Sequence, residues 1–147
     1  MKEKIILRVI SKFLIPYILL FGLYVQWHGD FGPGGGFQAG VIFASGFILY
    51  GLIFGVSNVR TAVPSAATRI LLPLGVLGYG LVGVMGIFKG GNFLDYNVLA
   101  AAPTGGQHLG IILIELGVGV TVATAMITIF STFASRAELQ KPRDEER

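Results

Sequence analysis

One carboxylate, Glu115, stands inside a long apolar run near the C-terminus, and its type suits ion chemistry best of all the residues in the chain. If this run crosses a bilayer, a charged carboxylate there costs several kcal/mol unless it is protonated, paired or hydrated. Removal from water favours the neutral form of a carboxyl group, so such a group can take up and release protons. Glu115 is therefore a candidate for an ion or proton pathway. The alternative is a structural hydrogen bond or ion pair to a neighbouring helix.

His108 precedes Glu115 by seven residues, so a helix places both on one stripe, about 10 Å apart along its axis. We include His108 as a second pathway candidate. Small and hydroxyl-bearing residues fall on the opposite stripe: Gly117, Thr121, Thr124 and Thr128. A helix that is polar on two sides should contact protein on both, and a small chain has few helices to provide this, so we expect other subunits around it. The alternative for the threonines is a hydrogen bond to carbonyls of their own helix.

A second motif, Pro33-Gly34-Gly35-Gly36-Phe37, lies between two apolar runs. Successive glycines before a helix can expose backbone N–H groups to an anion. No Lys-Ser or Lys-Thr follows, so the motif is not a P-loop, and nucleotide binding is excluded. Glycine also permits positive φ angles, and proline fixes φ, so the motif predicts a tight turn into the next helix, with Phe37 packed against a partner.

Metal and cofactor chemistry is not expected. His28, Asp30, His108 and Glu115 have ligand types that fit zinc loosely, but they lack a compact ligand spacing. The chain has no cysteine, which excludes disulfides, thiolate ligands and cysteine nucleophiles. No nucleophile–base pair or cofactor motif occurs, so we do not expect an enzyme.

The elements that must position these residues are transmembrane helices. Hydrophobic residues make up 53% of the chain and charged residues 13%, about half the usual globular share of roughly 25%. Four runs are long enough to cross a bilayer core, which needs about 20 mostly apolar helical residues. The sequence therefore predicts an all-α membrane protein, a bundle of four helices over residues 9–26, 37–56, 70–88 and 108–131, within a transmembrane domain of residues 1–133, followed by a polar tail over residues 134–147.

Glycines support a tight bundle. Two predicted helices each carry small residues on about one face: Gly40, Ala44, Gly51 and Gly55 on the second, and Gly75, Gly78, Gly83 and Gly86 on the third. Small residues let helix backbones approach closely in lipid, where packing drives association.

The basic residues are distributed unevenly across the connections. Ten Lys and Arg residues fall before the first helix, near its start, in the second connection and in the tail, whereas the remaining connections carry only Lys89. The positive-inside rule therefore predicts that both termini are cytoplasmic. The same residues form no basic patch, so we read the net charge of +3 as a topology signal and expect no nucleic-acid partner.

Three segments resemble the B subunit of Mrp-type multisubunit cation/proton antiporters. They are residues 23–29 together with 33–40, residues 90–97, and residues 106–110 with Glu115. The resemblance covers about residues 9–133. It implies a small subunit of a cell-membrane complex that exchanges cytoplasmic Na⁺ for external protons, driven by the proton-motive force, in support of pH homeostasis and salt tolerance. It also implies that the loop from Pro33 to Phe37 matters for activity.

Two alternatives remain open beside this resemblance. Related subunits occur in membrane-bound hydrogenase-type respiratory complexes, and a purely structural spacer between larger subunits is also compatible with the sequence. The chain has a single carboxylate within its predicted spans, which is too few for a complete exchange path. We therefore expect it to act with other subunits, Na⁺ and protons rather than alone.

Overall fold

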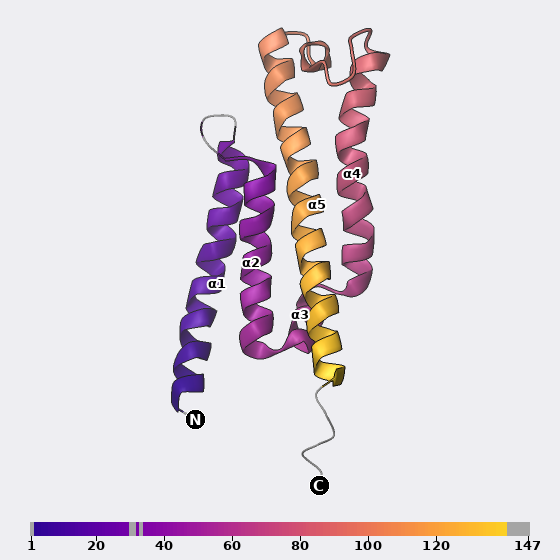
Figure 1. The fold of residues 1–147 in the computed structure, drawn as a ribbon. Helices are drawn as coiled ribbons and strands as arrows, with labels where there is room; N and C mark the ends of the chain where they lie inside the picture. Colours follow the sequence, from indigo (N-terminus) through magenta and orange to yellow (C-terminus); the bar gives the residue numbers. More distant parts are fainter. Residues whose placement is uncertain (1, 30–31, 33, 141–147) are drawn as a thin grey trace.

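The computed structural model describes residues 2–29, 32 and 34–140, and all its long elements are helices (Figure 1). They are α1 (Lys2–His28), α2 (Gly36–Phe54), the short α3 (Val56–Ala62), α4 (Ser65–Phe88), the 3-10 turn η1 (Tyr96–Leu99) and α5 (Pro103–Gln140). The described part of the chain contains no strand. Four helices, α1, α2, α4 and α5, are long and apolar enough to cross a membrane, which confirms the four predicted spans.

The helix bounds differ from the predicted ones mainly at the ends. α1, α4 and α5 continue past the apolar windows, because a helix need not stop where the hydrocarbon stops. α5 has 38 residues, about 57 Å, and it includes residues 134–140 of the predicted tail. α2 instead ends at Phe54, two residues early, because Gly55 adopts φ 99°, a left-handed conformation that favours glycine.

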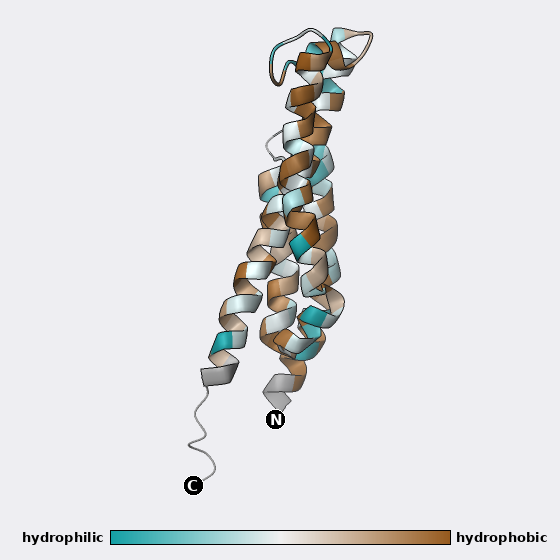
Figure 2. Ribbon diagram, turned by 90° about the vertical axis from the view of Figure 1, so that its right-hand side faces the viewer, coloured by the Kyte–Doolittle hydropathy of each residue, from teal (hydrophilic) through white to brown (hydrophobic). Residues whose placement is uncertain are grey.

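The four long helices stand in a row rather than closing around one core (Figure 1). The main packed pairs are α1 with α2, α2 with α5, and α5 with α4, so α1 and α4 form the two flanks. Seen from the side, the row overlaps into a narrow profile with apolar segments along its length (Figure 2). The core is correspondingly small: among the described residues, the buried hydrophobic ones are Ala39, Ala44, Val56, Val59, Val82, Ala123 and Ile127, and three of them, Ala44, Val59 and Ile127, form one cluster. Each long helix therefore leaves much of its apolar surface uncovered.

The start of α1 and the end of α5 lie at the same end of the row, which we call the basic end (Figure 1). There α3 buries Val56 and Val59, and the Arg60 guanidinium donates a hydrogen bond of 2.7 Å to the Ser135 hydroxyl of α5. The Lys12 ammonium lies over the Phe54 ring, 5.7 Å from its centroid. These contacts place two positively charged residues, Lys12 of α1 and Arg60 of α3, at this end of the row.

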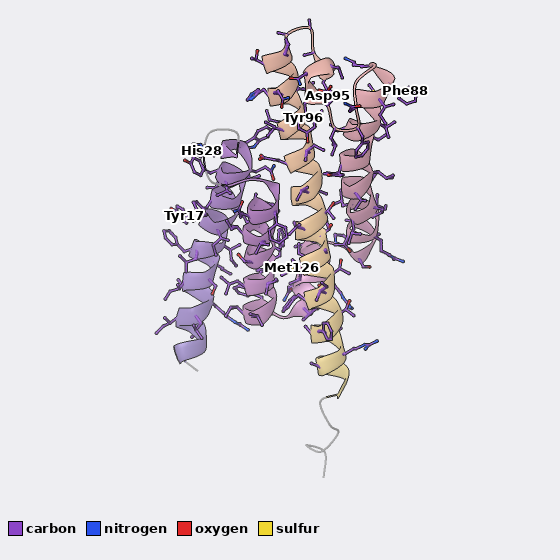
Figure 3. The ribbon with its side chains drawn as sticks, turned by 45° about the horizontal axis from the view of Figure 1, so that its top comes forward. Tyr17, His28, Phe88, Asp95, Tyr96 and Met126 are labelled. Atoms are coloured by element: carbon purple, nitrogen blue, oxygen red, sulfur yellow. The ribbon has the colours of Figure 1, made fainter. Side chains whose placement is uncertain are left out.

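The opposite end, the loop end, carries the α1–α2 loop and the cap segment, residues 90–99. The cap segment fills the space between α4 and α5: a Cβ built at Gly83 would clash with the Phe93 ring, and one at Gly110 with the Tyr96 ring. Figure 3 shows Asp95 and Tyr96 at this end. Asp95 accepts a hydrogen bond from the Asn97 N–H and so caps η1.

Glycines make the α4–α5 contact close, but not all those predicted take part. A Cβ built at Gly75 would clash with the Thr121 hydroxyl and would lie 2.7 Å from the Gly117 carbonyl oxygen. Gly78 was predicted on the same face, yet a Cβ there has no atom of the chain within 4 Å. Gly55 was also assigned to a packing face of α2, and it instead ends that helix. These two assignments were wrong.

Candidate functional site

Glu115 lies on the side of α5 that packs against α2. Its carboxylate lies against Gly29 and Gly35, and its backbone lies against Gly36; we call these three glycines the glycine cradle. A Cβ built at Gly29 would clash with both carboxylate oxygens, and one at Gly35 would lie 3.0 Å from Oε1. A Cβ at Gly36 would clash with the Glu115 carbonyl oxygen. Glycine is therefore required at three positions for the carboxylate and its helix to lie this close to the α1–α2 loop.

Two of the cradle glycines start α2. Gly35 has φ 130° and ψ −178°, a region of backbone conformation that is essentially restricted to glycine, and Gly36 is the first helical residue. The N-cap position offers no side-chain hydrogen bond. The α1–α2 loop thus combines a glycine-dependent conformation with a helix N-terminus that no side chain of its own cap covers.

Two electrostatic effects act on the Glu115 carboxyl group in opposite directions. The first N–H groups of a helix have no intrahelical partner, and the helix dipole favours a negative charge near them by about 0.3–2 kcal/mol. Partial burial of Glu115 favours the neutral carboxyl group. The N-terminus of α2 offers N–H donors rather than oxygen ligands, so the arrangement suits a carboxyl group that binds a proton better than one that coordinates a cation.

The position of Glu115 along α5 places the cradle below the loop end. Eight residues, about 12 Å of helix, separate Glu115 from Gln107, whose side chain bonds to Asn97 in the cap segment. Twenty residues, about 30 Å, separate it from Ser135 at the basic end. Gln107 and Ser135 are about 42 Å apart along the helix, the thickness of a bilayer with its headgroups, and a bilayer centred between them would place Glu115 about 6 Å inside the hydrocarbon.

Non-helical backbone at that depth is tolerated only where protein covers it or water reaches it. Gly29, Gly34 and Gly35 are such backbone, and Gly34 is backed by Val25 of α1. The end of the α1–α2 hairpin therefore requires water or a further protein chain around it.

A second polar side chain, Gln26 of α1, lies one turn below the carboxylate. A Cβ built at Gly119 of α5 would clash with the Gln26 amide oxygen and would lie 3.3 Å from the Gly36 carbonyl oxygen. Sequence reasoning assigned no role to Gln26 or Gly29. The signal available was a single amide at the end of an apolar run, followed three residues later by glycine.

The other predicted site residues are distributed unevenly. His108 is exposed on the same side of α5 as Glu115, nearer the loop end. Phe37 is the second residue of α2 and is 63% exposed, so it faces away from the rest of the chain. Pro33 lies outside the described residues. His28 stacks on Tyr24, with ring centroids 5.1 Å apart, at the loop end of α1 (Figure 3).

The opposite stripe of α5 faces α4, and Glu115 on the first stripe lies on the side that packs against α2, so helices of this chain cover part of both stripes, whereas His108 stays exposed. The threonine alternative is confirmed: the hydroxyls of Thr121, Thr124 and Thr128 donate to the carbonyls of Gly117, Val120 and Thr124 at 2.7–2.8 Å. In the described part of the chain, no three His, Cys, Asp or Glu residues group as metal ligands.

Comparison with known proteins decides the family. Residues 6–128 match the profile of a domain related to the MnhB subunit of Na⁺/H⁺ antiporter. The chain belongs to the MnhB family. Proteins of Staphylococcus aureus strains Newman, JH1 and Mu3, each named as a candidate antiporter subunit mnhB2, are 38% identical over 133 residues, which cover 88% of this chain and 94% of theirs.

Membership of the MnhB family fixes the class of function. The chain is an integral membrane subunit of the Na⁺/H⁺ antiporter type and a component of a transporter rather than an enzyme. Its four apolar helices fit a multi-pass protein of the plasma membrane. Other subunits are its partners.

Proposed function

We propose that Glu115 takes up and releases protons in the half of the membrane nearer the loop end, as this chain's contribution to Na⁺/H⁺ exchange. The observation that supports this most is the glycine cradle at the N-terminus of α2, which holds a carboxylate at membrane depth beside uncapped N–H donors. His108, on the same side of α5, lies between Glu115 and the end of the helix, and we assign it to the route by which protons reach the site.

The basic end faces the cytoplasm in this proposal. Arg8, Lys12, Arg60 and Arg136 support it, because Lys and Arg accumulate on the cytoplasmic side of membrane proteins. The loop end then faces outward, and Glu115 meets protons from outside. The larger subunits supply the remaining exchange path, since this chain has one carboxylate within its four spans.

The experiment is Na⁺/H⁺ exchange in membrane vesicles that carry the whole complex with Glu115→Gln, after native gel electrophoresis has verified assembly. Glutamine keeps the shape of the side chain and removes its proton-binding capacity. Asp95→Asn is the matched control, because it neutralises another carboxylate near the loop end, one that caps η1. We expect normal assembly of both, loss of exchange for Glu115→Gln and retained exchange for Asp95→Asn. Full exchange with Glu115→Gln would make the residue structural and the chain a scaffold.

A further inference from the structure

A small pocket at the basic end lies between α3, α4 and α5, and most of its lining residues are polar. Its volume is about 80 Å³, enough for a group of the size of a phosphate and too small for a nucleotide. We call it the basic-end pocket. Six of its eight lining residues carry a guanidinium or a hydroxyl group, and they come from all three helices: Arg60, Ser65, Thr68, Thr128, Ser131 and Thr132.

The Arg60 guanidinium brings a positive charge to the basic-end pocket, and no carboxylate among the described side chains pairs with it. Its hydrogen bond within the described part of the chain goes to the neutral Ser135 hydroxyl, so most of its five N–H donors stay available. A second guanidinium is held nearby, because Nε of Arg69 donates to the Ser65 carbonyl oxygen at 3.3 Å. A guanidinium presents its N–H groups in a fork that matches the oxygens of a phosphate. The pocket therefore favours an anion with several oxygens.

The hydroxyl groups of the basic-end pocket divide into donors and acceptors. Those of Ser65 and Ser131 make no hydrogen bond within the part of the chain that the structure describes, so they can donate to a phosphate oxygen. Those of Thr68, Thr128 and Thr132 already donate to carbonyls of their own helices at 2.7–3.2 Å, so toward a ligand they can only accept. A ligand that satisfies both sets carries a phosphate with O–H donors beside it.

The level of the basic-end pocket along α5 favours a lipid as the source of this phosphate. Ser131 and Thr128 lie four and seven residues before Ser135, or about 6 and 10 Å along the helix toward the loop end. In a bilayer centred between Gln107 and Ser135, each headgroup region is about 6 Å deep, so the pocket extends from the headgroups to the edge of the hydrocarbon. Lipid phosphates lie at this level, and basic pockets between transmembrane helices bind anionic headgroups.

We propose that the basic-end pocket binds the phosphate of an anionic phospholipid whose headgroup carries hydroxyls, of which phosphatidylglycerol is a simple example. The phosphate accepts hydrogen bonds from Arg60 and the two serine hydroxyls, and the headgroup hydroxyls donate to the threonine oxygens. The bound lipid thereby links the α3–α4 connection to α5. Sixteen residues of α5, about 24 Å, separate Ser131 from Glu115, so this site is independent of proton exchange at Glu115.

The test is photo-crosslinking of the purified whole complex with phosphatidylglycerol that carries a photo-reactive group close to its phosphate. Mass spectrometry of the digested chain then locates the adducts. We expect adducts within residues 60–68 and 127–132, and we expect excess unlabelled phosphatidylglycerol to abolish them while phosphatidylcholine and inorganic phosphate have little effect. Equal competition by phosphatidylcholine would show unselective contact with lipid, and equal competition by inorganic phosphate would assign the pocket to a free anion. Either result would overturn the proposal.

Arg60→Gln tests the guanidinium, with two matched controls. Arg8→Gln removes the same charge from α1, where Arg8 lies over the Phe54 ring, and Ser135→Ala removes the hydrogen-bond partner of Arg60 but keeps its charge. We expect Arg60→Gln to reduce adducts in the pocket by about tenfold, as for loss of a hydrogen bond to a charged group, and both controls to retain them. Equal labelling of Arg60→Gln and Arg8→Gln would contradict the proposal. The competition experiment needs no variant, so it decides the question even if Arg60→Gln fails to assemble.

Discussion

Replacement of Gly36 by alanine tests the glycine cradle most sharply, because the clash it creates involves backbone. The new Cβ would lie 2.8 Å from the Glu115 carbonyl carbon and 2.9 Å from its Cα, against 3.4–4 Å for an ordinary contact. Neither atom can rotate away, and the Glu115 carbonyl oxygen lies closer still, so the start of α2 must move from α5 by about 1–1.5 Å. Overpacking of this kind costs about 1–3 kcal/mol. The shift also separates the α2 N-terminus from the carboxylate.

A second variant, Gly29→Ala, tests the contact with the Glu115 carboxylate separately from the packing of α2 against α5. Its Cβ meets only the end of the Glu115 side chain, which can rotate, so α2 and α5 stay in contact while the carboxylate is displaced. Gly80→Ala is the control, since nothing lies near its Cβ. The assays are the temperature at which the detergent-solubilised complex dissociates and Na⁺/H⁺ exchange in vesicles. We expect Gly36→Ala to lower both, Gly29→Ala to lower exchange alone, and Gly80→Ala to change neither.

The result that refutes this reasoning is a Gly36→Ala complex with the dissociation temperature and exchange rate of Gly80→Ala. The backbone contact between α2 and α5 would then be absent from the assembled complex. The reasoning would also be contradicted if Gly29→Ala lowered the dissociation temperature as much as Gly36→Ala. The clash with a side chain would then have the same effect as the clash with backbone.

Three further predictions follow from other contacts. Thr121→Val should leave exchange and assembly nearly unchanged, because the hydroxyl bonds only to the Gly117 carbonyl of its own helix; loss of exchange in vesicles would assign the hydroxyl to the ion path. Burial, and less strongly Tyr79, raises the pKa of Tyr96 above 10.0, so its stabilising contribution is present below that pH and is lost as the pH rises through the folded pKa. Tyr96→Phe should therefore reduce the alkaline fall in dissociation temperature, and an identical fall would contradict this. Since the chain has no cysteine, single cysteines at Ala101 and Ala137 report topology: an impermeant thiol reagent should label Ala101→Cys in intact cells and Ala137→Cys only after permeabilisation, and the reverse pattern would invert the proposed orientation.

The spans could be predicted from the sequence because hydropathy and length report directly on a bilayer-crossing helix. The ends of the helices could not be predicted in this way. α5, for example, continues to Gln140 through polar residues, because a helix can extend into water as well as through lipid. The arrangement of the four long helices in a row also could not be predicted from the sequence. Periodicity placed Gly75 and Gly78 on one face, but the face is wider than the contact, so one glycine packs and the other stays open.

The central residue of the candidate site could be predicted from the sequence, but the residues around it could not. Glu115 was identifiable because an acid within an apolar run is costly and seldom incidental. Helical periodicity then gave its stripe, which pointed to His108. Periodicity gives no axial register between helices, so it could not show that α2 begins at the level of Glu115 or that Gly29 completes the cradle.

The central claim, that Glu115 exchanges protons from within the glycine cradle, is tested most directly by carbodiimide labelling of the assembled complex in membranes. Carbodiimides react with protonated carboxyl groups, and mass spectrometry of the digested chain quantifies the adduct at Glu115 over a series of pH values. The account predicts labelling at Glu115 that is strong at acidic pH, declines as the pH rises, and is absent in Glu115→Gln. No labelling at any pH, or labelling that is independent of pH, would contradict it.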